Sequence, residues 1–100
     1  MARCRITVLR CTFDAELKEK YIPDPDYGPC PYFRPGQVYW YDGGEERPEG
    51  FGCQVGWDCI SGPAGGMARP DPPFFAETGH VVCCNDGCRP VIFLLEHVAD

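Results

Sequence analysis

Cysteine is the residue type of this 100-residue chain with the most chemistry to offer, because there are eight of them. They are Cys4, Cys11, Cys30, Cys53, Cys59, Cys83, Cys84 and Cys88. In small secreted proteins an even set of this kind forms disulfides. In a reducing compartment thiols bind metals, take part in redox reactions, or pack as small apolar side chains. The choice between these uses is the main functional question that the sequence poses.

The composition favours free thiols over disulfides. Arg5 and Arg10 interrupt the apolar run that an amino-terminal secretory signal requires. The longest apolar run, residues 91–95, is far too short to cross a membrane. A chain of 100 residues that is 44% hydrophobic can fold around its own core without covalent links. We therefore expect a single cytoplasmic domain, residues 1–100, with no membrane association.

A metal site is the leading hypothesis for the cysteines. Zinc and iron–sulfur ligands often come as Cys-x-x-Cys pairs, and this chain has none, so a site must be assembled from distant segments. Cys30 stands in a rigid Gly-Pro-Cys-Pro loop, which fixes its direction. The candidate ligands are Cys30, Cys53, Cys84, Cys83 and Cys4. The expected cofactor is zinc or an iron–sulfur cluster, and otherwise none.

Two other functions remain open. An activated cysteine beside Asp86 and Arg89 would make a thiol-redox or small catalytic protein, because a nearby arginine favours the thiolate. Alternatively, the cysteines only pack, in a structural or partner-binding domain. His80 is a further candidate ligand or base, and Trp57 either packs in the core or walls a pocket. No phosphate-binding loop or nucleophile-elbow motif is present, so whether the protein is an enzyme stays open.

The charge distribution restricts the partners. The net charge is −6, with five basic and three acidic residues in 1–21 and four basic and twelve acidic residues in 22–100. No basic stripe exists, so we expect no nucleic-acid binding. An acidic segment at residues 45–49 and an open sheet edge are compatible with a protein partner or a homodimer.

The first half of the chain predicts a strand, a short helix and a second strand. Residues 3–13 alternate, with Cys4, Ile6 and Val8 on one face and Cys11 on the other. Asp14 caps a helix over residues 15–21. A proline-rich loop follows at residues 22–36, and a strand at 37–42.

The second half is less regular and ends in a hairpin. Residues 51–60 are ambiguous. Residues 61–79 form a connection rich in glycine and proline, either a functional loop or one short helix, with Phe74-Phe75 as an anchor to the core. The hairpin has strands at 80–84 and 89–98, closed by a bulged turn with Gly87 in the left-handed region. In this register Cys84 lies across from Cys88, whereas Cys83 points to the opposite face. The expected fold is an α+β domain. It has a small antiparallel, partly barrel-like sheet, one or two short helices and long Pro/Gly-rich loops.

Four segments carry a resemblance to a known family. They are Arg3-Cys4-Arg5-Ile6-Thr7-Val8 with Phe13, Gly28-Pro29-Cys30-Pro31 with Phe33-x-x-Gly36-Gln37, Pro48-x-Gly50-Phe51-x-Cys53 with Trp57, and Cys83-Cys84-Asn85-Asp86-Gly87-x-Arg89-Pro90-Val91-x-Phe93. In these the chain resembles a family of small uncharacterised bacterial and archaeal proteins, each about one domain long. The resemblance implies no activity. It implies that Cys4, Cys30, Cys53, Cys83 and Cys84 belong to the family pattern, and that Cys11, Cys59 and Cys88 do not.

Overall fold

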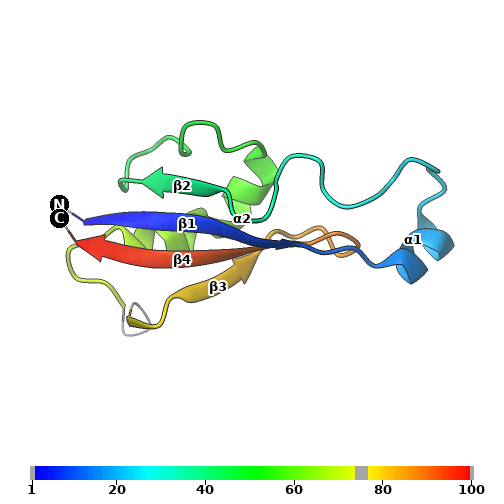
Figure 1. Cartoon of the computed structure of the whole chain (residues 1–100). Helices are drawn as coiled ribbons and strands as arrows, with labels where there is room; N and C mark the ends of the chain where they lie inside the picture. Colours follow the sequence, from blue (N-terminus) through cyan, green and yellow to red (C-terminus); the bar gives the residue numbers. More distant parts are fainter. Residues whose placement is uncertain (1, 74–76, 100) are drawn as a thin grey trace.

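The fold is a four-stranded antiparallel sheet with two helices, seen in a computed structural model that describes residues 2–73 and 77–99 (Figure 1). The elements are β1 (Ala2–Cys11), α1 (Ala15–Tyr21), β2 (Val38–Tyr41), α2 (Gln54–Met67), β3 (His80–Cys83) and β4 (Val91–Ala99). The strand order is β2-β1-β4-β3, so the two long strands lie at the centre and the two short strands at the edges. The predicted α+β class is confirmed. The barrel-like element of the prediction is wrong, because the sheet is not closed: α2 covers the core face and buries it without closure.

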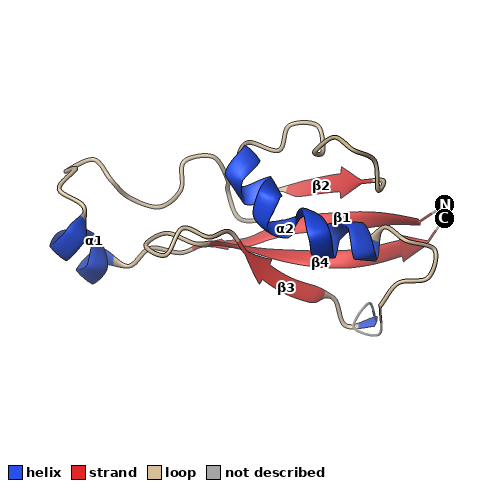
Figure 2. Ribbon diagram, turned by 180° about the vertical axis from the view of Figure 1, so that it is seen from behind, coloured by secondary structure: helices blue, strands red, loops and turns tan. Residues whose placement is uncertain are grey.

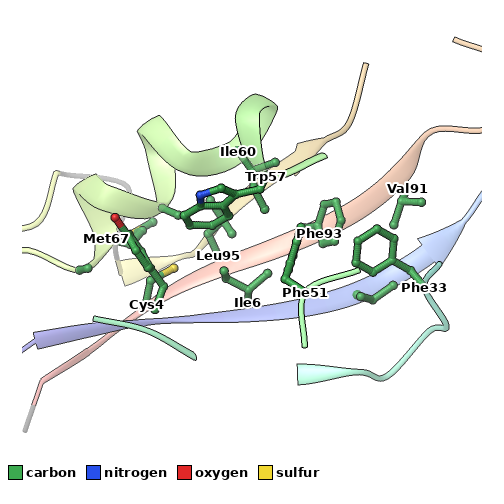
Figure 3. Packing of buried hydrophobic residues seen from close by; sticks show 14 residues of the cluster. Cys4, Ile6, Phe33, Phe51, Trp57, Ile60, Met67, Val91, Phe93 and Leu95 are labelled. Carbon is green, nitrogen blue, oxygen red and sulfur yellow. The ribbon is translucent and has the colours of Figure 1, made fainter. Parts of the chain in front are cut away.

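The hydrophobic core lies between α2 and one face of the sheet (Figure 2). Ile60 and Met67 of α2 are fully buried, and so is Ile6 of β1 (Figure 3). Phe51, just before α2, is at the centre of an aromatic cluster, with its ring centroid 4.9 Å from that of Phe33 and 5.7 Å from that of Phe93. This cluster fixes the chain on both sides of Cys53, where the candidate site is found.

Helix α2 occupies a region where the sequence pattern is ambiguous. Its 14 residues include Gly62, Pro63 and Gly65, which are poor helix formers, so local propensity does not predict it. Its buried positions Trp57, Ile60, Ala64 and Met67 nevertheless recur every three or four residues and form one face. Tertiary burial of that face therefore stabilises the helix. Of the two alternatives for residues 61–79, the helix is confirmed up to Met67, as the second part of α2, and the predicted Phe74-Phe75 anchor lies outside the described residues.

A β-bulge in β1 changes the direction of its last residues. Cys4, Ile6 and Val8 are buried, as the alternation predicts. The register then shifts between Val8 and Arg10, so that Val8 pairs with Phe93 and Cys11 with Val91. Phe93 and Val91 are both buried, so Cys11 lies on the same core-facing side as Val8. The prediction that Cys11 points to the opposite face is wrong, because one extra residue inverts the alternation.

The loop between β3 and β4 is longer than the predicted turn. It covers residues 84–90, and Gly87 does not have the positive φ that the bulged turn requires. Instead, the Asp86 carboxylate accepts hydrogen bonds from the backbone N–H groups of Cys88 and Arg89, at 3.1 and 3.2 Å, and these curl the loop. Cys88 is buried and its thiol donates to the Asp14 carbonyl oxygen at 3.4 Å. The predicted cross-strand pairing of Cys84 with Cys88 is therefore wrong.

The short helix α1 is confirmed, with the Asp14 carboxylate accepting from the Leu17 N–H at 3.0 Å. It has no buried residue and projects from the end of the sheet opposite the two termini (Figure 1). Among the described residues, no helix is long and apolar enough to cross a membrane.

Candidate functional site

Three cysteines from distant parts of the sequence line one pocket of about 280 Å³. Cys30 belongs to the proline-rich loop before β2, Cys53 immediately precedes α2, and Cys84 immediately follows β3. The remaining wall residues are mainly apolar or aromatic, namely Tyr32, Phe33, Val55, Gly56 and Val91. The other three are polar: Asn85, Asp86 and Arg89. The pocket therefore combines three of the candidate ligands with the predicted Asp–Arg pair.

The sulfurs of Cys53 and Cys84 both accept backbone hydrogen bonds. Cys53 is the N-cap of α2, and its Sγ accepts from the Gly56 N–H at 3.4 Å. The Cys84 Sγ accepts from the Val91 N–H at 3.3 Å. N–H groups of this kind are the donors that surround thiolate ligands in metal centres. The two side chains are thus oriented by backbone that the fold holds in place.

Gly56 allows the start of α2 to approach Cys84. A Cβ atom at this position would lie 3.8 Å from the Cys53 Sγ and 3.9 Å from the Cys84 Cβ. The missing side chain therefore leaves a small space between the two cysteines. A larger residue at position 56 would occupy part of the volume into which both side chains face.

Arg89 holds a positive charge beside Cys30. Its guanidinium pairs with the Asp86 carboxylate at 3.2 Å, donates to the Gly28 carbonyl oxygen at 3.4 Å, and lies 4.2 Å from the centroid of the Tyr27 ring. The pKa of Arg89 is raised: desolvation acts to lower it, but the hydrogen bond to Asp86, followed by the charges of Tyr27, Asp86 and Cys30, outweighs that effect. This ion pair joins the two residues that the sequence hypothesis places beside an activated cysteine. It anchors the cation next to a thiol.

Cys11 is a fourth cysteine next to the pocket, and the sequence prediction did not include it among the site residues. Its thiol donates to the carbonyl oxygen of Phe33, a pocket residue, at 3.3 Å. Burial raises the pKa of the Cys11 thiol, and the nearby charges of Cys30 and Cys84 raise it further. The sequence carries no signal for this placement, because it depends on the bulge in β1.

The other predicted site residues lie away from the pocket. Cys4 is fully buried in the core, where burial raises the pKa of its thiol to about 12. Cys83 is exposed and pairs with Ile92, so it points away from the face that carries Cys84. His80 begins β3 opposite Leu95, and Trp57 is buried with its ring centroid 4.8 Å from that of Tyr41. None of these four residues lines the pocket.

The pocket cysteines surround a cavity instead of converging on one point. Across residues 2–73 and 77–99, no group of three or more His, Cys, Asp or Glu side chains is arranged to hold a single metal ion. Coordination of one zinc ion places every sulfur about 2.3 Å from the same point. The change from one staggered χ1 rotamer to another moves a cysteine Sγ by about 3 Å, so modest side-chain rotation alters this arrangement.

A larger hollow of about 470 Å³ lies beside the acidic loop after β2. Trp40 forms one wall and stacks against the guanidinium of Arg3, which lies 4.5 Å from the ring centroid. Half of the other lining residues are carboxylates, among them Glu45 and Glu49, and the lining contains no thiol or imidazole. This hollow therefore offers no cysteine or histidine ligand, unlike the cysteine-lined pocket.

Comparison with known proteins gives no relative for this chain: no family model, no curated protein and no solved structure matches it. The resemblance to a family of small uncharacterised proteins therefore stays a prediction. The function has to be argued from the site itself.

Proposed function

We propose that the cysteine-lined pocket binds a thiophilic metal centre, zinc or an iron–sulfur cluster, with Cys30, Cys53 and Cys84 as ligands. The observation that carries the proposal is that three cysteines, separated by more than twenty residues from one another, line the same pocket. Thiolates are the preferred ligands of both kinds of centre. If these cysteines only packed as small apolar side chains, nothing would require three of them to line the same pocket.

Two further observations support thiolate ligation. The sulfurs of Cys53 and Cys84 accept backbone N–H groups, and Arg89 supplies a positive charge on the side of Cys30. Both features offset the negative charge that several thiolates bring to a centre. Because the free side chains do not converge on one point, a single metal ion would require some of them to rotate inward.

A thiol-redox or catalytic role is the second candidate. Its support is the positive charge that Arg89 holds beside Cys30 in the same pocket. In this case the pocket would hold the substrate, and no metal would be required. A purely structural role of the cysteines is the third candidate, and it fits Cys4 better than it fits the pocket cysteines.

Elemental analysis of protein purified without oxygen tests the proposal. We expect stoichiometric zinc or iron in the wild type, and loss of most of it in Cys30→Ser, Cys53→Ser and Cys84→Ser. Cys83→Ser is the matched control, because Cys83 is adjacent in sequence to Cys84 but exposed on the other face of the sheet. Wild-type protein without stoichiometric metal would contradict the proposal.

Thiol titration of the same samples separates the other two candidates. One cysteine that reacts much faster than the rest, and slows in Arg89→Gln, would support thiol catalysis. Uniformly slow cysteines in the pocket would support packing alone.

A further inference from the structure

We infer that the metal centre is an iron–sulfur cluster instead of a single zinc ion, and that Cys11 is its fourth ligand. The inference rests on the proposed metal-binding function of the pocket. It extends that function by naming the class of cofactor and by adding a ligand from β1, which the sequence alone placed on the wrong face.

Cys11 and Cys84 lie on opposite sides of Val91. Cys11 pairs with Val91 across the β1–β4 ladder, and Cys84 bonds to Val91 on the other side through both its N–H and its Sγ. All three residues are on the core-facing side of the sheet, where the pocket is located. Cys11 also reaches the pocket wall directly, through its hydrogen bond to the Phe33 carbonyl oxygen at 3.3 Å.

The spacing of the strands argues against one zinc ion held by both cysteines. Neighbouring strands are about 4.8 Å apart, so residues two strands apart have Cα atoms roughly 10 Å apart. The Sγ is about 3 Å from its Cα, so even side chains leaning toward each other leave the sulfurs about 4 Å apart or more. Two sulfurs on one tetrahedral zinc ion lie about 3.8 Å apart at a Zn–S distance of about 2.3 Å. Both side chains would have to lean fully toward each other to reach that separation, whereas side chains of a sheet stand roughly perpendicular to it. The Val91 side chain, fully buried between them, also occupies that line.

A cluster avoids this conflict because its thiolates bind different iron atoms and are spread around a larger body. The pocket matches that requirement in two ways. Its volume of about 280 Å³ is much larger than one ion needs, and the sulfurs surround it instead of meeting at a point. Four cysteines, Cys11, Cys30, Cys53 and Cys84, complete the usual ligand set of a two-iron or four-iron cluster.

Anaerobic reconstitution with ferrous iron and sulfide, compared with zinc alone, tests the inference. We expect the wild type to bind roughly two to four irons per chain with as much acid-labile sulfide, and to develop visible charge-transfer absorbance. Cys11→Ser should lose most of the sulfide and absorbance. Its hydroxyl can still donate to the Phe33 carbonyl oxygen, so the substitution preserves the local hydrogen bond. Cys59→Ser is the control. Cys59 is also half-buried against the core and also outside the pocket lining, but it lies on α2, whereas Cys11 pairs with Val91 and donates to Phe33, both of which line the pocket.

The outcomes separate this inference from the function on which it rests. One zinc per chain and no cluster would overturn the inference and leave the metal-binding proposal standing. No uptake of zinc or of iron and sulfide would overturn both. A full cluster in Cys11→Ser would overturn the role of Cys11. The comparison of cluster with zinc in the wild type needs no variant, and thermal unfolding of the metal-free Cys11→Ser protein verifies that it folds.

Discussion

Replacement of Gly56 by alanine is expected to stabilise the fold and to weaken the site at the same time. Gly56 lies in the first turn of α2, and its nearest neighbours are Cys53 and Cys84. An added Cβ would meet them at 3.8–3.9 Å, which is ordinary van der Waals contact. The substitution therefore introduces no clash, and the Gly56 N–H remains free to donate to the Cys53 Sγ.

The magnitude follows from helix propensity. Glycine in a helix costs about 0.5–1 kcal/mol relative to alanine, so Gly56→Ala should raise the free energy of unfolding by up to that amount. For a domain of this size, that corresponds to an increase in Tm of roughly 2–8 °C. The same methyl group fills the space between Cys53 and Cys84, so we expect the affinity of the pocket for its metal centre to fall roughly tenfold or more, a loss of about 1.4 kcal/mol.

Thermal unfolding of the metal-free protein, followed by circular dichroism, and metal titration of the same sample measure the two effects. Gly65→Ala is the matched control. Gly65 lies in α2, and apart from its own helix backbone and chain neighbours no atom of the described residues lies within 4 Å of the added Cβ. It should stabilise by a similar amount and leave metal binding unchanged. The reasoning is refuted if Gly56→Ala lowers Tm by several degrees, or if it binds metal as tightly as Gly65→Ala.

Three other predictions concern the core and the surroundings of the pocket. Phe51→Ala should lower the free energy of unfolding by about 3–5 kcal/mol in urea titrations, because its ring is buried among other rings, and Phe51→Leu should cost much less. Asp86 has a lowered pKa: desolvation raises it, but backbone N–H bonds and the Arg89 side chain outweigh that effect. The stabilisation by the Asp86 carboxylate is therefore complete above its ordinary pKa of 3.8 and is lost as the pH falls further. The difference in unfolding free energy between wild type and Asp86→Asn should shrink below about pH 4, and a constant difference would contradict this. In native protein at pH 8, iodoacetamide should modify the exposed Cys83 quickly and the buried Cys4 very slowly, because burial raises the pKa of Cys4 to about 12. Peptide mass spectrometry measures both rates.

Interactions between residues close together in the sequence determine the parts of the fold that the sequence predicts well. The alternation of Cys4, Ile6 and Val8 places those side chains in the core, and Asp14 begins α1 through its own carboxylate. Both are decided by neighbouring residues. Helix α2 is different, since Gly62 and Pro63 oppose it and only burial against the sheet stabilises it. Local propensity could not predict it for that reason.

The same contrast between local and long-range interactions applies to the candidate site. Asp86 and Arg89 are only three residues apart, and sequence reasoning named both, although it did not predict their ion pair. The convergence of Cys30, Cys53 and Cys84 joins segments far apart in the chain. Sequence reasoning named these residues as candidates together with others, but it had no means of selecting Cys84 over Cys83.

By itself, then, the sequence determined the number of cysteines, the net negative charge, the α+β class and which side chains of β1 face the core up to Val8. Only the tertiary structure decided which thiols share a pocket. The β-bulge after Val8 turns Cys11 toward Val91, and the curled loop at Asp86 separates Cys88 from Cys84. The physical reason is that a side chain's direction in a strand reverses with every residue, so a single extra residue changes which face it joins, and strand pairing alone fixes that register.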